Sequence, residues 1–127
     1  MAVALVIVSH SVKLAEGVVE LASQMARDVA FRAAGGTEDG DLGTSFDKVY
    51  GAVEELLADG HEVAILTDLG SATMTVESVL EMVDPDRVRF APGPLVEGAV
   101  AAAVTAQVGG GLAAVVEAAK ASDAFPG

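Results

Sequence analysis

The sequence predicts an α/β fold: a doubly wound, four-stranded parallel sheet in the order 2-1-3-4, with helices on both faces. Uninterrupted apolar runs at 3–8 and 63–66 are typical of parallel strands buried on both faces, so we expect these strands in the middle of the sheet. Segments with helical periodicity alternate with the strands, which favours right-handed crossovers. The other two predicted strands carry Arg32, Arg87 or Arg89, which indicates that they form the edges.

The first part of the chain predicts a strand, a helix, a weaker strand and a loop. After the strand at 3–8, a helix ends near Arg27. The apolar stripe of this helix is expected to face the core and consists of Leu14, Val18, Leu21 and Met25. The weaker strand follows at 29–32. Residues 33–44 are rich in glycine and acidic side chains, and they predict a long loop without regular structure.

A second helix follows the loop, and a second buried strand follows that helix. Thr44 or Ser45 can cap the helix, and Asp59 and Gly60 end it. The predicted apolar face of the helix consists of Phe46, Val49, Tyr50, Val53 and Leu57. The continuous apolar run at 63–66 then forms the third strand of the chain.

The third helix and the fourth strand complete the predicted sheet. Residues 67–71 lead into a helix that Asp84 and Pro85 end. The apolar residues aligned along this helix are Ala72, Val76, Val79, Leu80 and Val83. Charged and apolar residues alternate over 87–91, as expected of an edge strand with one wetter side.

Two more helices are predicted at the end of the chain, and the first of them indicates a dimer. Pro94 suits the first turn of a helix over about 95–107, a glycine run at 109–111 interrupts it, and a last helix covers 112–121. Small apolar residues occupy almost every face of 97–108. A helix that is apolar all round must be covered on more than one side, so we expect a second subunit there and a homodimer.

Length, composition and charge limit the possible functions. The 127 residues suit one domain, expected at 1–121, with 122–127 as a tail or linker stub. No apolar run approaches the ~18 residues of a membrane span and no signal peptide is evident, so we expect a cytoplasmic protein without a membrane partner. The net charge of −12 argues against nucleic acid. Since there is no cysteine, covalent chemistry must use other nucleophiles.

The predicted strand order brings one histidine and one aspartate together. In a doubly wound sheet, ligands bind beyond the carboxyl ends of the strands where the connections depart in opposite directions. His10 follows the first strand and Asp68 follows the third, so we expect the two side chains to face each other there, with one ring nitrogen free to solvent. His61 precedes the third strand at the opposite edge, and we assign it no role.

The predicted partners of His10 allow more than one chemistry. Asp68 has three possible roles: a turn residue, a carboxylate that orients the imidazole as a nucleophile, or itself a phosphoryl acceptor. The third role would call for acidic residues that bind Mg²⁺ after the first strand, and the sequence has none there. Gly70, Ser71 and Thr73 begin a helix whose free amides could bind a phosphoryl group, while ordinary capping by Ser71 or Thr73 is the alternative.

Further wall residues are expected around the same crevice. Ser11 lies beside His10 in the sequence, and Gly36 and Thr37 follow the second strand, where a flexible turn explains them nearly as well. The segment 36–43 lacks the lysine of a phosphate-binding P-loop, and no glycine-rich dinucleotide motif follows the first strand. The sequence therefore offers little evidence for nucleotide binding, and we expect no metal site.

Several separated motifs resemble one known family. The segments VIVSHSVKLAEG, AAGG, LTDLGSA and PLVEGA occur in order over about 3–108. They closely resemble the phosphocarrier subunits of phosphoenolpyruvate-dependent dihydroxyacetone kinases, relatives of the mannose-type IIA domains of the bacterial sugar phosphotransferase system (PTS). The family's phosphorylated histidine matches His10, its partner carboxylate matches Asp68, and its GSA segment matches Gly70, Ser71 and Ala72. The segment DLGSA favours the dihydroxyacetone branch.

The resemblance implies a phosphotransferase subunit with a phosphohistidine intermediate. His10 would accept the phosphoryl group from the phosphocarrier HPr and pass it to ADP on the nucleotide-binding kinase subunit for use on dihydroxyacetone (glycerone). It implies a homodimer and no cofactor or metal on this subunit, since the nucleotide and magnesium belong to the partner. Some members carry further domains, so the chain is either a short member or one domain of a longer one. A sugar-transport IIA carrier, a non-covalent small-molecule module and phosphorylation on Asp68 remain open alternatives.

Overall fold

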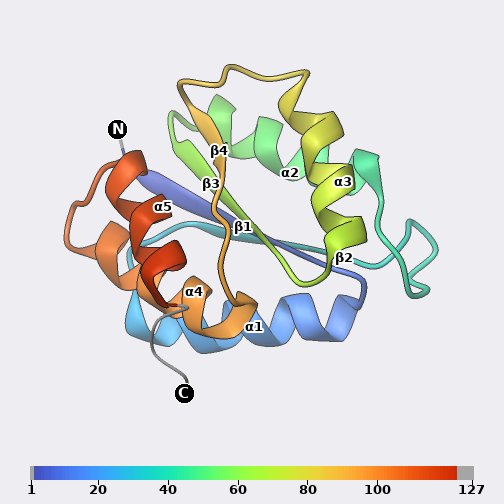
Figure 1. Ribbon diagram of the computed structural model, residues 1–127, viewed down its shortest axis with the longest axis horizontal. Coiled ribbons are helices and arrows are strands. Elements are labelled where there is room, and N and C mark those ends of the chain that lie inside the picture. Colours follow the sequence, from blue (N-terminus) through green and yellow to red (C-terminus); the bar gives the residue numbers. More distant parts are fainter. Residues whose placement is uncertain (1, 123–127) are drawn as a thin grey trace.

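The computed structural model describes residues 2–122, and its centre is a four-stranded parallel sheet (Figure 1). The strands are β1 (Val3–Ser9), β2 (Phe31–Gly35), β3 (Glu62–Thr67) and β4 (Val88–Phe90). Their order is β2-β1-β3-β4, so the predicted fold class and strand order are confirmed. The tail predicted at 122–127 lies outside the described residues, except for Ser122.

Five helices cover the two faces of the sheet (Figure 1). One face carries α1 (Val12–Met25), α4 (Leu95–Gln107) and α5 (Leu112–Ala121), and the other carries α2 (Phe46–Ala58) and α3 (Gly70–Leu80). Among residues 2–122, no helix is both long enough and apolar enough to cross a membrane.

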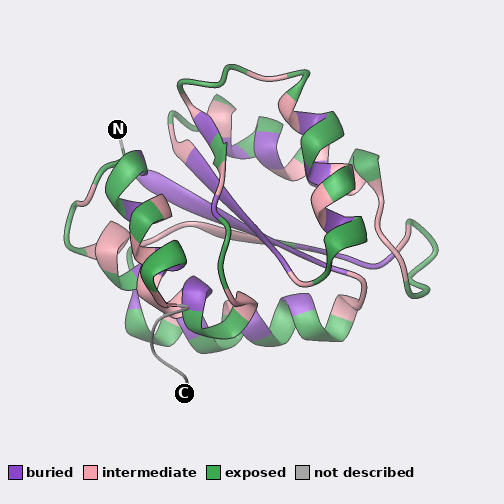
Figure 2. Ribbon diagram, viewed as in Figure 1, coloured by how far each residue is buried: buried purple, intermediate pink, exposed green. Residues whose placement is uncertain are grey.

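The two middle strands form the buried centre of the molecule. Every residue of β1 is buried (Figure 2). The side chains of β1 alternate between the two clusters of core residues on either face of the sheet. In the parallel register, Val8 lies opposite Thr67 and Ser9 lies opposite Gly35. The three strands β2, β1 and β3 therefore end side by side, which places the segments that follow them at one edge.

The second strand was predicted too early in the chain. It was expected at 29–32, but β2 covers Phe31–Gly35 and includes the start of the predicted loop. Alanine and glycine have low strand propensity, yet here they pair with the end of β1, and tertiary pairing outweighs local preference. Gly35 also lies so close to α1 that an added Cβ would be 2.5 Å from the carbonyl oxygen of Ser11.

The inward face of α1 differs from the predicted stripe by one position. The buried residues are Ala15, Val18 and Ala22, whereas Leu14, Leu21 and Met25 are exposed. Both stripes contain Val18, so the periodicity alone is compatible with either. The two alanines leave room for the helix to pack closely on the sheet. The helix also ends at Met25, before the expected Arg27.

The remaining helices and the edge strand follow the predicted pattern with smaller differences. In α2 the buried residues are Val49, Val53 and Leu56, while Phe46 is exposed and stacks on Tyr50 with ring centroids 5.6 Å apart. The predicted alignment in α3 holds up to its end at Leu80, so Val83 lies beyond the helix. The edge strand β4 is shorter than the predicted 87–91 because only Val88–Phe90 pairs with β3.

The strongly apolar helix α4 is covered largely within its own chain. It packs against α1, α5 and the sheet, and its buried residues are Gly98, Ala99, Ala102 and Ala103. These contacts bury much of the apolar surface of α4 that was expected to need a partner. Val96 and Val104 stay exposed, so an apolar strip remains on the outer side of α4.

Candidate functional site

His10 and Asp68 meet at the carboxyl edge of the sheet, as the strand order predicts. His10 follows β1 and Asp68 follows β3, and these strands are hydrogen-bonded neighbours. The Nδ1 atom of His10 lies 3.0 Å from Oδ1 of Asp68, and the His10 amide donates to Oδ2 at 3.0 Å. The carboxylate therefore holds both the ring and the backbone of the histidine.

Ser9 supports this pair and was not singled out from the sequence. Its side chain is fully buried, and its hydroxyl donates to Oδ2 of Asp68 at 2.9 Å. The hydroxyl oxygen of Ser9 also accepts a hydrogen bond from the amide of Ser11 at 3.0 Å. The available signal was a hydroxyl residue at the end of an otherwise apolar buried strand, directly before the histidine.

The surroundings of Asp68 favour its ionised form. Desolvation by burial raises the pKa of Asp68, but hydrogen bonds from the amide and ring of His10, the hydroxyl of Ser9 and the amide of Leu69 outweigh it and hold the pKa below its ordinary value. An ionised carboxylate only accepts hydrogen bonds, so the proton between the two side chains belongs on Nδ1. In the neutral ring, Nε2 then carries the lone pair.

Nε2 has a hydrogen-bond partner at the surface, which the sequence did not predict. The hydroxyl of Ser71 lies 2.5 Å from it. In the tautomer that Asp68 selects, the Ser71 hydroxyl is the donor and Nε2 the acceptor. The side chain of His10 is 24% exposed, so the ring stands at the surface and is not sealed in the core. Exposing the lone pair requires the Ser71 side chain to move its oxygen away from Nε2.

The start of α3 offers amide groups beside Nε2. The helix begins at Gly70 after the N-cap residue Leu69, and no side chain of the described residues caps it. The alternative that Ser71 or Thr73 caps the helix is therefore wrong. The first amides of a helix have no acceptor within it, and a Cβ added at Gly70 would meet no atom within 4 Å. An anion can approach this positive end of the helix.

Two other predicted wall residues have structural partners instead. Thr73 points its hydroxyl at the hydroxyl of Thr67, 2.9 Å away, which attaches α3 to the end of β3. Ser11 caps α1, because its hydroxyl accepts the amide of Leu14 at 3.1 Å. Neither contact involves the ring of His10.

The loop after β2 is bonded to the backbone of the site. The amide of Gly36 donates to the carbonyl of Ser9 at 3.0 Å, and the amide of Gly43 donates to the carbonyl of His10 at 2.9 Å. Thr37 closes a tight turn within the loop, donating its amide to the carbonyl of Asp41 at 2.9 Å. Gly36 thus bonds to the backbone of the strand end before His10, while Thr37 shapes the loop.

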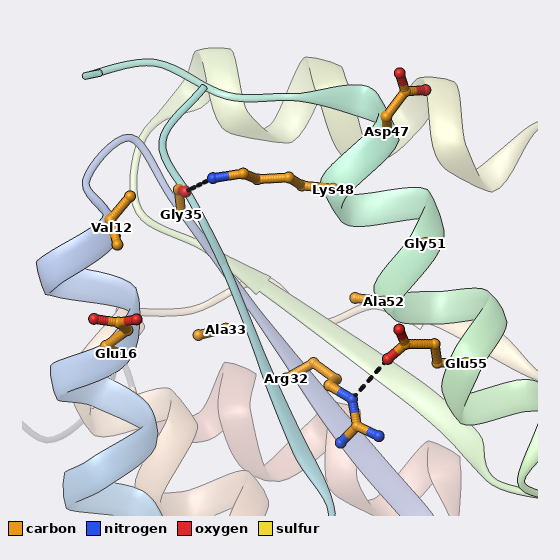
Figure 3. A pocket seen from close by; sticks show the side chains of 10 residues that line it. All are labelled: Val12, Glu16, Arg32, Ala33, Gly35, Asp47, Lys48, Gly51, Ala52 and Glu55. Carbon is orange, nitrogen blue, oxygen red and sulfur yellow. Dashed lines mark hydrogen bonds and ion pairs between the residues drawn. The ribbon is translucent and has the colours of Figure 1, made fainter. Parts of the chain in front are cut away.

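Two cavities lie near this edge, and neither is lined by His10 or Asp68. The first, of about 430 Å³, lies between α1 and α2 along the free edge of β2 (Figure 3). In it, Lys48 donates to the carbonyl of Gly35 at 2.9 Å and Arg32 pairs with Glu55 at 3.1 Å. The second, of about 600 Å³, is lined by Ser11, Val12, Lys13, Glu16, Gly40, Asp41 and Leu42. The His10–Asp68 pair therefore lies outside both cavities, on a partly exposed rim.

The second histidine, His61, lies away from this pair. His61 lies at the opposite edge of the sheet, directly before β3, as predicted. Its carbonyl accepts a hydrogen bond from Arg87 at 3.0 Å. Within residues 2–122, no three histidine or acidic side chains are grouped so that they could hold a metal ion.

Comparisons with known proteins agree with one another. A family model described as EIIA-man, PTS system fructose IIA component, matches residues 4–116. The phosphotransferase subunit DhaM of the PTS-dependent dihydroxyacetone kinase of Lactococcus lactis subsp. lactis is 41% identical over 113 residues, covering 89% of each chain. The phosphoryl donor subunit DhaM of the PEP-dependent dihydroxyacetone kinase 1 of Listeria innocua is 45% identical over 103 residues, covering 81% of each. A crystal structure of EF1359, a protein of unknown function, has a TM-score of 0.84 at 33% identity and covers 94% of both chains.

Proposed function

The chain belongs to the EIIA-man family, the PTS system fructose IIA components, and on that premise we propose that it is the phosphoryl-donor subunit of a dihydroxyacetone kinase. The relatives reported above are subunits of such kinases, and they match the chain over most of their own length. The observation that carries the proposal is the hydrogen bond between Nδ1 of His10 and the carboxylate of Asp68, which leaves Nε2 as the nucleophile.

The proposed reaction is the transfer of a phosphoryl group to and from Nε2 of His10. The lone pair of Nε2 attacks phosphorus in line, a nitrogen–phosphorus bond forms, and the bond to the donor breaks on the opposite side. The ring gains positive charge while Nδ1 keeps its proton, and Asp68 stabilises that charge. The Ser71 hydroxyl leaves Nε2 and donates instead to a phosphoryl oxygen, beside the first amides of α3.

The proposed partners are HPr as donor and ADP on a nucleotide-binding kinase subunit as acceptor. The position of His10 on a partly exposed rim, outside both cavities, suits successive protein partners better than a bound small molecule. The loop beside it carries Glu38, Asp39 and Asp41, which would attract a basic partner surface. The chemistry described needs no cofactor or metal on this chain. A cytoplasmic location stays a prediction.

A homodimer is part of the proposal. The residues that support it are the exposed apolar side chains of α1 and α4 on one face of the sheet, namely Leu14, Leu21, Met25, Val96 and Val104. Light scattering should give twice the chain mass, and Leu21→Glu should shift it toward one chain mass. A monomer at micromolar concentration would contradict this part of the proposal.

The decisive experiment is phosphorylation by purified components. Incubation with phosphoenolpyruvate, enzyme I and HPr should add one phosphoryl group to the intact chain. The group should be labile in acid and stable in alkali, as expected of phosphohistidine. An alkali-labile group would assign the reaction to Asp68, and no mass gain would exclude a phosphoryl carrier and leave the non-covalent binding module.

One alternative keeps the same site and changes the acceptor. The matching family is described as a fructose IIA component, so transfer to a sugar-transport component is the second candidate. The phosphorylated chain can be offered both acceptors in turn. Transfer to ADP on the kinase subunit supports the first proposal, and transfer only to a sugar-transport protein supports the second.

A further inference from the structure

Two threonines meet beside the site without being bonded to the ring of His10. Thr44 lies at the end of the β2–α2 loop and Thr75 lies in α3, and their hydroxyl oxygens are 2.7 Å apart. Within residues 2–122, the ring itself is bonded to Asp68 and Ser71. The threonine pair joins two segments, and each of these segments reaches the histidine from a different side.

The loop segment that ends in Thr44 holds the backbone of His10. Gly43, directly before Thr44, donates its amide to the His10 carbonyl at 2.9 Å. Gly43 has a φ of +138°, a conformation that other residues rarely adopt, and an added Cβ would lie 2.9 Å from Cγ2 of Thr37. The path of the chain through Gly43 and Thr44 is therefore closely defined.

The helix that carries Thr75 also carries Ser71. Residues four apart in a helix lie on the same side, about 6 Å apart along the axis, so the two hydroxyls move together. Within the described part of the chain, no side chain caps α3, and the buried residues of this helix are Ala72, Val76 and Val79. Among the described residues, α3 is linked to other elements by few hydroxyl contacts: Thr73 with Thr67, Thr75 with Thr44, and Ser71 with His10.

We propose that Thr44 and Thr75 are positioning residues for phosphoryl transfer, since their bond ties the loop that holds the His10 backbone to the helix that carries Ser71. This inference rests on the proposed function. The bond fixes α3 relative to the histidine, whereas the contact between Thr67 and Thr73 fixes α3 relative to β3. Transfer needs Nε2 and the Ser71 hydroxyl aligned to about 0.5 Å, and a free loop would relax that alignment.

Valine variants test the pair because they keep the branched shape and remove the hydroxyl. Thr44→Val and Thr75→Val should each slow phosphorylation of His10 by phospho-HPr about 3- to 10-fold, the rate equivalent of one hydrogen bond. The double variant should be no slower than the slower single variant, because both remove the same contact. The matched control is Ser78→Ala, since the Ser78 hydroxyl bonds only the Met74 carbonyl within α3, and its rate should not change.

The action through Ser71 is tested separately. In a Ser71→Ala background, Thr75→Val should slow transfer less than twofold further, because the hydroxyl that faces Nε2 of His10 is then already absent. The ¹⁵N resonance of Nε2 in the unphosphorylated protein reports the bond to Ser71 directly. It should move in both valine variants and stay in place in Ser78→Ala.

Some results would overturn the inference and leave the proposed function intact. One such result is a wild-type phosphorylation rate together with an unmoved Nε2 resonance in folded valine variants. Another is a double variant whose rate loss is the sum of the two single losses. A third is a Thr75→Val variant that loses as much rate in the Ser71→Ala background as in the wild type. If phospho-HPr does not phosphorylate the wild-type chain, the proposed function fails, and the Nε2 resonance still decides whether the pair positions Ser71 against the ring.

Discussion

The two histidines of the chain lie at opposite edges of the same sheet and have different surroundings. His10 follows β1 at the carboxyl edge, and both of its ring nitrogens have partners, Asp68 and Ser71. His61 precedes β3 at the other edge, where the hydrogen bonds described for it are made by its backbone, including one to the carbonyl of Leu56. The same residue type therefore has a polar network at one edge and a backbone role at the other.

The direction of the strands explains the difference. In a parallel sheet, each helix that follows a strand begins near the carboxyl edge and ends near the amino edge, as α1, α2 and α3 do here (Figure 1). The carboxyl edge therefore receives free amides and positive helix ends, and the amino edge receives carbonyls. Helix ends therefore favour an anion at the first edge and disfavour it at the second.

The largest expected difference between the two edges is in the phosphorylation of variants that lack one histidine. His10→Gln should abolish phosphorylation, because glutamine has no nucleophilic ring nitrogen, and the loss should exceed about 1,000-fold. His61→Gln is the matched control and should be phosphorylated like the wild type. Intact mass after incubation with phosphoenolpyruvate, enzyme I and HPr measures both. Labelling of the His10 variant would show that another residue accepts the group.

The next largest effect should come from the carboxylate. Asp68→Asn keeps the shape and removes the charge that stabilises the ring during transfer, so we expect a rate about 100-fold lower. Rapid-quench kinetics with phospho-HPr measure it. The control is Asp59→Asn, at the end of α2 and away from the carboxyl edge, which should leave the rate unchanged. Equal rates in the two variants would remove Asp68 from the mechanism.

A glycine at the carboxyl edge tests how tightly the site is packed. A Cβ at Gly35 would lie 2.5 Å from the Ser11 carbonyl and 2.9 Å from Cβ of Ala15, so Gly35→Ala should lower the free energy of unfolding by about 1–3 kcal/mol. Gly51 in α2 has no atom within 4 Å of the same position, so Gly51→Ala should raise it by about 0.5–1 kcal/mol. Urea unfolding of both variants measures the difference, and a loss of stability in Gly51→Ala as large as in Gly35→Ala would contradict it.

The smallest effect is a dependence of stability on pH that comes from Asp68. The pKa of this carboxyl is lower in the folded chain than its unfolded value of about 3.9, so its contribution is present above about pH 4 and is lost as pH falls through the folded value. The difference in unfolding free energy between the wild type and Asp68→Asn should therefore shrink as the pH falls below about 4. A difference that stays constant over that range would mean that ionisation of Asp68 does not stabilise the folded chain.

Much of the site could be predicted because it depends on strand order. Continuous apolar runs identified β1 and β3 as the middle strands, and the residues directly after neighbouring parallel strands must lie close together. That reasoning found His10 and Asp68. It could not find that Ser71 occupies Nε2, because no local pattern indicates the direction of a hydroxyl 61 residues away in the chain.

Other predictions from the sequence were wrong or incomplete because they depend on contacts between segments far apart in the chain. The extent of β2 was wrong because alanine and glycine carry no strand signal and gain their structure from pairing with β1. The stripe of α1 was misplaced by one position because large side chains dominate a hydrophobic pattern, while close packing on the sheet favoured alanine. The role of Ser9 was missed because its burial and its bond to Asp68 exist only in the assembled sheet.

The sequence by itself determined the alternation of strands and helices, the order of the strands and the edge at which His10 and Asp68 meet, since these follow from periodicity and chain direction. The tertiary structure alone decided which ring nitrogen bonds Asp68, which hydroxyl faces the other nitrogen, and how the loop after β2 holds the histidine backbone. The physical reason is range: periodicity acts between near neighbours, whereas hydrogen bonds between distant segments form only when packing has brought them within 3 Å.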